Sequence, residues 1–137
     1  MALVPRVVSA SCLAVVVLAG LTVQLVRHLA WADAAGSVLY AMAACFAIAL
    51  LSRGRPARVA GAAFLACVLV ELAQLTGIPA RLPALSLLLG SGFDPRDIGW
   101  YAVGSVLGAA VMALVQRVST SRGVRASREL SASRGRR

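Results

Sequence analysis

Hydrophobic residues gather in four long runs along the chain, and short stretches of polar residues and helix breakers separate the runs. Because a helix rises 1.5 Å per residue, about 20 residues cross the ~30 Å hydrocarbon core of a membrane. The runs cover residues 7–26, 34–51, 59–76 and 98–115. The pattern therefore predicts an all-α fold in which residues 1–118 form a bundle of four transmembrane helices.

Residues typical of helix ends stand at the borders of these runs. Asp33 directly precedes the second run, which predicts that its side chain caps that helix. A basic turn with glycine and proline, residues 52–58, separates the second run from the third. Asp94, Pro95 and Asp97 have the spacing of an N-cap, a first helical residue and a capping-box acid. The fourth helix is therefore expected to begin at these residues.

Three further segments complete the organisation of the chain. Residues 84–89 are apolar but too few to span, which predicts a short interfacial or re-entrant helix between the third and fourth spans. Residues 119–137 are rich in Ser, Arg and Gly, which predicts a disordered tail. The first run is also open to interpretation as a signal peptide, since Ala30-Trp31-Ala32 resembles a cleavage site. Its length and the later spans favour an uncleaved helix.

Composition excludes the soluble classes of protein. Of the 137 residues, 60% are hydrophobic and 14% are charged, against about 25% charged residues in an ordinary soluble domain. A soluble domain of this length has too much surface for its volume to hide so many apolar side chains. Intrinsic disorder requires low hydrophobicity, so it is excluded for the chain as a whole.

Arginine dominates the charge and indicates an orientation. The formal net charge is +9, from fourteen arginines and five acids. If the N-terminus is cytoplasmic, eleven arginines lie on the inner side and three on the outer side, which fits the positive-inside rule. Seven arginines lie in the last 21 residues: Arg117, Arg122, Arg125, Arg128, Arg134, Arg136 and Arg137. We expect a bacterial inner-membrane protein with both termini cytoplasmic, whose tail binds anionic lipid rather than nucleic acid.

One acid stands in the middle of a predicted span and is the leading candidate for chemistry. Glu71 lies in the third run, and Gln74 shares its helix face. A carboxylate within the membrane costs about 2.5–3.5 kcal/mol, so it must face other helices or a wet cavity. Tyr101 shares a face with Asp97 at the start of the fourth span. The candidate polar pocket, on the outer side of the membrane, comprises Glu71, Gln74, Asp97, Tyr101 and Asp94.

Each candidate also has a purely structural interpretation. The aspartates suit helix caps, and the Glu71 and Gln74 side chains suit an interhelical hydrogen-bonded pair. Gly104 and Gly108 form a G-x-x-x-G pattern that favours close helix packing. No cluster of metal ligands occurs, so neither a metal nor a cofactor is expected. The residues interpreted as apolar packing or headgroup contacts are Cys12, Cys45, Cys67 and His28.

The order of motifs resembles a known family. The chain reads VELAQLTG from residue 70 and GSGFDPRD from residue 90, followed by Tyr101 and Gly104. This E-x-x-Q, then G-x-x-F-x-x-x-D-x-x-x-Y-x-x-G, resembles a family of small bacterial membrane proteins, domain of unknown function 2809. It is also similar to the E-x-x-Q and D-x-x-x-N signature of VanZ-like proteins, which are tied to glycopeptide resistance. The resemblance covers residues 36–108 and implies the membrane architecture.

The chain departs from the family pattern at two positions. The second helix of the family opens Gly-Asp-x-Leu-Tyr, whereas Ser37 replaces the acid here. Asp33 lies one turn earlier, and whether it takes the place of that acid stays open. Pro95 stands where the family has an aromatic residue. The weaker site candidates are accordingly Asp33, Ser37, Arg81 and Arg96.

Three functions fit the sequence. An accessory or binding protein that engages a lipid or lipid-linked envelope component through the polar pocket is favoured. A membrane enzyme with a carboxylate as general base on a lipid-linked substrate is the first alternative, although common hydrolase and nucleotide-binding motifs are missing. A small transporter or proton-relay subunit that uses Glu71 is the second.

Overall fold

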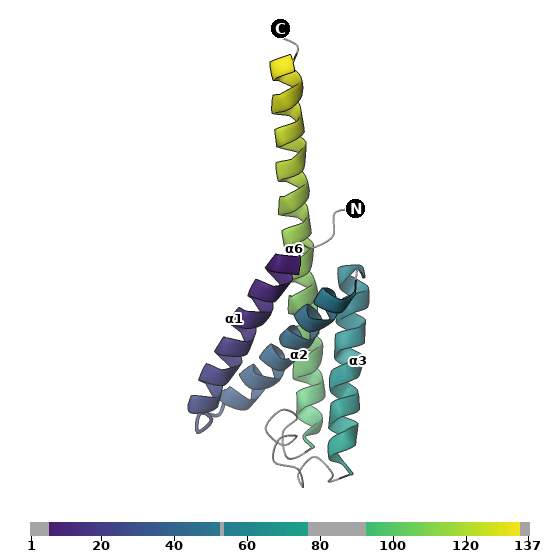
Figure 1. The fold of residues 1–137 in the computed structure, drawn as a ribbon. Coiled ribbons are helices and arrows are strands. Elements are labelled where there is room, and N and C mark those ends of the chain that lie inside the picture. Colours follow the sequence, from purple (N-terminus) through teal and green to yellow (C-terminus); the bar gives the residue numbers. More distant parts are fainter. Residues whose placement is uncertain (1–5, 53, 77–92, 135–137) are drawn as a thin grey trace.

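The computed structural model describes residues 6–52, 54–76 and 93–134, which form four long helices and no strand (Figure 1). The helices are α1 (Arg6–Leu25), α2 (Ala32–Leu51), α3 (Pro56–Gln74) and α6 (Pro95–Arg134). Each contains a stretch long and apolar enough to cross a membrane. The predicted all-α fold with four spans is confirmed. The short helix expected at residues 84–89 lies outside the described residues.

Two helix starts differ from the expectation. Helix α2 begins at Ala32 after Trp31, which makes no side-chain cap hydrogen bond. Asp33 therefore lies inside the first turn rather than at the N-cap, where its carboxylate still meets the positive end of the helix dipole. Helix α3 begins at Pro56, which the sequence analysis placed in the basic turn. Proline suits a first helical position because its missing N–H has no partner there in any helix.

Helix α6 begins as the sequence predicts and ends much later. The Arg96 N–H donates to Asp94 Oδ1 over 2.9 Å, so Asp94 caps the helix. The helix then continues to Arg134, whereas residues 119–137 were expected to be disordered. The correction has a physical reason: extending a formed helix needs no new nucleus, and Arg, Ala, Leu and Glu in this segment are good helix formers.

A seam of small residues joins α6 to α2. A Cβ added at Gly104 would fall on the Val38 carbonyl oxygen and within 2.9 Å of the Ala41 Cβ atom. One added at Gly108 would lie 2.9 Å from the Cys45 Cβ atom. The missing side chains therefore allow the two backbones to approach closely. Helix α2 also packs against α1 on its other side, and α3 packs against both α2 and α6 (Figure 1).

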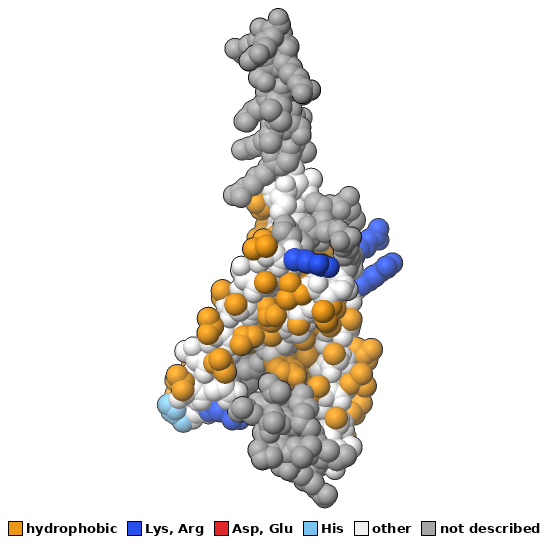
Figure 2. Space-filling model, in the orientation of Figure 1, with side chains coloured by type: hydrophobic (Ala, Val, Ile, Leu, Met, Phe, Trp, Pro, Cys, Tyr) orange, Lys and Arg blue, Asp and Glu red, His pale blue; other side chains and the backbone are white. Residues whose placement is uncertain are grey.

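Apolar side chains fill the interior and also cover the outside of the bundle. One cluster of buried residues draws on all four helices: Val16, Cys45, Phe46, Val59, Ala60, Ala63 and Met112. Large side chains such as Leu18, Leu69 and Val106 are more than half exposed, and Figure 2 shows hydrophobic atoms across much of the visible face. Such a surface belongs in lipid, because in water it would be a site of association.

Candidate functional site

Glu71 is buried where α3 meets the start of α6. Its side chain is only 1% exposed, and both carboxylate oxygens accept a hydrogen bond from α6 or the residue before it. The Tyr101 hydroxyl donates to Oε1 over 2.6 Å, and the Asp94 N–H donates to Oε2 over 3.3 Å. The acid therefore faces its neighbouring helices, as its place in an apolar run requires.

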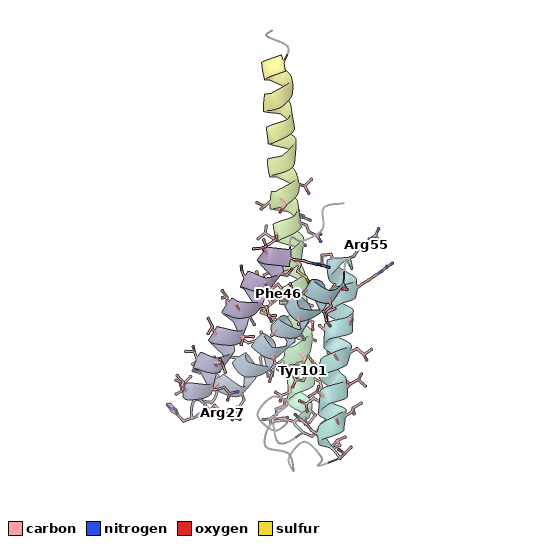
Figure 3. All side chains as sticks on the ribbon, viewed as in Figure 1. Arg27, Phe46, Arg55 and Tyr101 are labelled. Carbon is pink, nitrogen blue, oxygen red and sulfur yellow. The ribbon has the colours of Figure 1, made fainter. Side chains whose placement is uncertain are left out.

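The local reason is the buried stripe of α3. The residues on this stripe repeat every three or four positions: Ala60, Ala63, Cys67, Glu71 and Gln74. This is the spacing of one helix face. The first three are small and fit tightly against neighbouring helices, while the last two bring polar groups into the same contact. Tyr101 lies beside this stripe on α6 (Figure 3).

The N-terminus of α6 supplies the compensating field for Glu71. No ion pair involves Glu71 within the described part of the chain. Instead, the carboxylate lies against the N-cap residue Asp94, where the exposed N–H groups and the helix dipole favour negative charge. Hydrogen bonds to a charged group are shorter and stronger than neutral ones, which fits the 2.6 Å bond from Tyr101.

A second polar contact joins α2 to α6. The Ser37 hydroxyl lies 2.7 Å from Asp97 Oδ1 and 3.0 Å from the backbone oxygen of Asp33. A serine hydroxyl has one proton, so these two acceptors share it. Ser37 is 8% exposed and Asp97 is half-buried. Gly104 lies seven residues after Asp97, on the same helix face, so the close backbone approach there sets up this hydrogen bond.

The structure thus brings together five of the predicted side chains, and the Asp94 backbone joins them. We define the polar cluster as Ser37, Glu71, Gln74, Asp94, Asp97 and Tyr101. Asp33 contributes its backbone carbonyl, and its side chain is exposed. Arg96 is exposed beside the cluster, and Arg81 lies outside the described residues.

Sequence reasoning missed Tyr40. Its ring lies 6.0 Å from the ring of Tyr101, centroid to centroid, at 48°. This tilted arrangement is favourable for aromatic pairs. The signal was present, because Tyr40 is three residues after Ser37 and so shares its helix face. Tyr40 and Tyr101 together wall the cluster off from the apolar interior formed by Ala41, Cys67 and Phe64.

The sequence profile described as "Protein of unknown function (DUF2809)" matches residues 26–105, which is more than half of the chain. The chain belongs to this family. No curated protein and no solved structure gave a significant match. The DUF2809 match starts after α1 ends and reaches Ser105, so it includes α2, α3 and every member of the polar cluster.

The cluster of this DUF2809 protein lies near one end of the apolar part of the bundle. Along α6, Asp94 and Arg117 are separated by about 35 Å at 1.5 Å per residue, slightly more than a hydrocarbon core of ~30 Å. Tyr101 lies about 10 Å from Asp94 by the same count. Glu71 therefore sits inside the apolar region, while Asp94 lies at its border. Among the described residues, no group of three His, Cys, Asp or Glu side chains could hold a metal ion.

Proposed function

We propose that this DUF2809 protein is a multi-pass inner-membrane protein that binds the headgroup of a lipid or lipid-linked envelope molecule at the polar cluster. The observation that carries the proposal is the hydrogen-bonded Glu71, which three helices enclose within the apolar region. Ionisable residues at such depth are expensive and are retained for function more often than in water. The adjoining exposed acids open the cluster toward the headgroup layer.

The distribution of arginine supports the orientation. Arg6, Arg55, Arg58 and Arg117 lie at the end opposite the cluster, whereas Arg27 and Arg96 lie at the cluster's end (Figure 1). Arginine-rich ends of short membrane proteins stay in the cytoplasm. In this orientation, the cluster faces the outer leaflet, and both termini are cytoplasmic. A ligand would enter from the leaflet in which envelope precursors are exposed to the outside.

The free groups at the cluster define the chemistry of the ligand. Asp97 accepts from Ser37 at one oxygen, and its other oxygen makes no hydrogen bond to a described residue. The exposed Asp33 and Asp94 add further acceptors. Acceptors of this kind suit a headgroup that presents N–H or O–H donors, such as an ammonium group or sugar hydroxyls. The Arg96 guanidinium beside them suits the phosphate of the same headgroup.

Glu71 serves as the organiser of the site and Asp97 as its ligand contact. Both Glu71 oxygens already accept hydrogen bonds, so this carboxylate is poorly placed to take a proton from a substrate. Asp97 stands nearer the border of the apolar region and keeps an oxygen for an incoming donor. This division of roles favours binding over general-base catalysis.

The test is the set of lipids that remain bound to the protein purified from its own membranes. We expect mass spectrometry to find one lipid class enriched on the wild-type protein over the bulk extract. Loss of one charge-assisted hydrogen bond of about 1.4 kcal/mol lowers affinity about tenfold, so Asp97→Asn is expected to lose most of the enrichment. Gly99→Ala is the matched control, because a Cβ at Gly99 meets nothing within 4 Å.

Two results would count against the proposal. One is a wild-type protein whose bound lipids mirror the bulk extract. The other is a folded Asp97→Asn protein that keeps the full enrichment, with the same helix content and melting temperature as the control. Glu71→Gln is used only alongside a stability measurement, because removal of this acid disturbs the contact between α3 and α6.

A further inference from the structure

Four exposed arginines from three helices surround the end of the bundle that lies opposite the polar cluster. We call them the arginine collar: Arg6, Arg55, Arg58 and Arg117. Figure 2 shows arginine side chains gathered at this end of the bundle, and Figure 3 labels Arg55 there. None of the four forms an ion pair with a described residue, so the collar presents unneutralised charge.

Helix geometry places the collar at one level. Helices α3 and α6 run in opposite directions and are joined by the bond between Glu71 and Tyr101. Arg55 comes 16 residues before Glu71, and Arg117 comes 16 residues after Tyr101. Both are therefore about 24 Å along the bundle from that bond. Arg6 opens α1, which runs opposite to α2 and so starts beside the end of α2.

The position of three of these arginines is unfavourable within their own helices. Arg6 is the first residue of α1, Arg55 precedes α3, and Arg58 lies in the first turn of α3. A helix N-terminus is its positive end, where cations are disfavoured and anions are bound. Neither α1 nor α3 carries an acid in its first turn to offset this charge. Two positive helix ends and four guanidinium groups therefore form one anion-attracting surface.

The described acids do not offset the collar either. Asp33, Glu71, Asp94 and Asp97 all lie at the other end of the bundle. The collar stands at the border of the apolar surface, the depth at which lipid phosphates lie. Guanidinium groups pair with phosphate through two parallel hydrogen bonds. An anionic phospholipid offers both the acyl chains that match the apolar side of this border and the phosphate that matches its charge.

We propose that the arginine collar is a binding site for the headgroups of anionic phospholipids in the leaflet at that end. The site is separate from the proposed outer-leaflet site and shares no residue with it. Helix α6 continues past the collar through residues 122–134, which add four arginines and one glutamate to this end of the chain. The sign of the charge is therefore the same in the helix that leaves the membrane here.

The experiment measures lipid binding to the purified full chain in neutral detergent by native mass spectrometry. The probes are phosphatidylglycerol and phosphatidylcholine with identical acyl chains. Arg55→Gln/Arg58→Gln removes two collar charges, and Arg27→Gln/Arg96→Gln removes two charges from the opposite end as the matched control. We expect wild-type protein to bind phosphatidylglycerol at least tenfold more tightly. The collar variant should lose most of this preference, and the control should stay within twofold of wild type.

Three results would overturn the proposal. The first is equal affinity of the wild-type protein for the two lipids. The second is an equal loss of phosphatidylglycerol binding in both double variants, which would indicate net charge rather than a site. The third is displacement of the lipid by a short single-stranded DNA at lower concentration, which would indicate a nucleic-acid surface. If the collar variant fails to fold, Arg117→Gln, an exposed position on α6, provides the same test.

Discussion

Gly104→Ala tests whether the close approach of α2 and α6 holds the site together. The added Cβ would fall on the Val38 carbonyl oxygen, 2.9 Å from the Ala41 Cβ atom and 3.0 Å from the Val38 carbonyl carbon. Ordinary carbon contacts are ~3.5–4.0 Å, so the helices must separate by roughly 1 Å. The obstacle is backbone, which cannot rotate away as a side chain can. Overpacking of this kind lowers the free energy of unfolding by about 1–3 kcal/mol.

The assay is equilibrium unfolding of the purified protein in mixed micelles, followed by loss of helical circular dichroism. Gly99→Ala in the same helix is the control, because its Cβ would meet nothing within 4 Å. It is expected to raise stability slightly, by up to about 1 kcal/mol, since alanine favours helix over glycine. Equal stability of the two variants would refute the close-packed seam.

The seam also predicts a coupling with the site. A separation of roughly 1 Å at Gly104 would weaken the 2.7 Å contact between Ser37 and Asp97. Ser37→Ala alone should cost about 0.6–1 kcal/mol, as interhelical hydrogen bonds in membranes do. The double variant Ser37→Ala/Gly104→Ala should therefore lose less than the sum of the single losses. Strict additivity would show that the glycine does not position the serine.

Two further outcomes are expected in the same unfolding assay. Tyr101→Phe removes the 2.6 Å donor to the buried Glu71, so it should lower the free energy of unfolding by about 1–3 kcal/mol; no change would mean that water replaces the hydroxyl freely. Met112→Ala opens a cavity at a 2% exposed position and should lower it by about 2 kcal/mol, the low end for such changes because lipid is as apolar as the core. Leu114→Ala, at a 62% exposed position, should have almost no effect, and an equal loss there would contradict the assigned core.

The spans and the inward direction of Glu71 could be predicted because each depends on a local property of the sequence. Run length decides whether a helix can cross a membrane, and the energetic penalty for a carboxylate in lipid decides which way Glu71 points. The capping position of Asp94 is equally local, since proline follows it directly. These inferences need no knowledge of which helix lies beside which.

The pairs within the polar cluster could not be predicted, because they join residues far apart in the sequence. Ser37 and Asp97 are 60 residues apart, and Glu71 and Tyr101 are 30 apart. Their contact depends on the direction and rotation of α2 and α3 against α6. Asp33 was misassigned as a cap because α2 starts one residue earlier, at Ala32. The helix through Arg134 was missed because composition alone does not show that α6 propagates past the membrane.

The opposite character of the two ends follows from where each helix begins. Helix α6 starts at the polar cluster, and acids gather there: Asp94 caps it, Asp97 lies in its first turn, and Glu71 reaches it from α3. Helices α1 and α3 start at the other end, where arginines stand at equally positive helix termini. One end therefore neutralises its helix dipole with the protein's own carboxylates, and the other leaves that task to an external anion. This asymmetry explains why the outer site should favour donors and the inner surface phosphates.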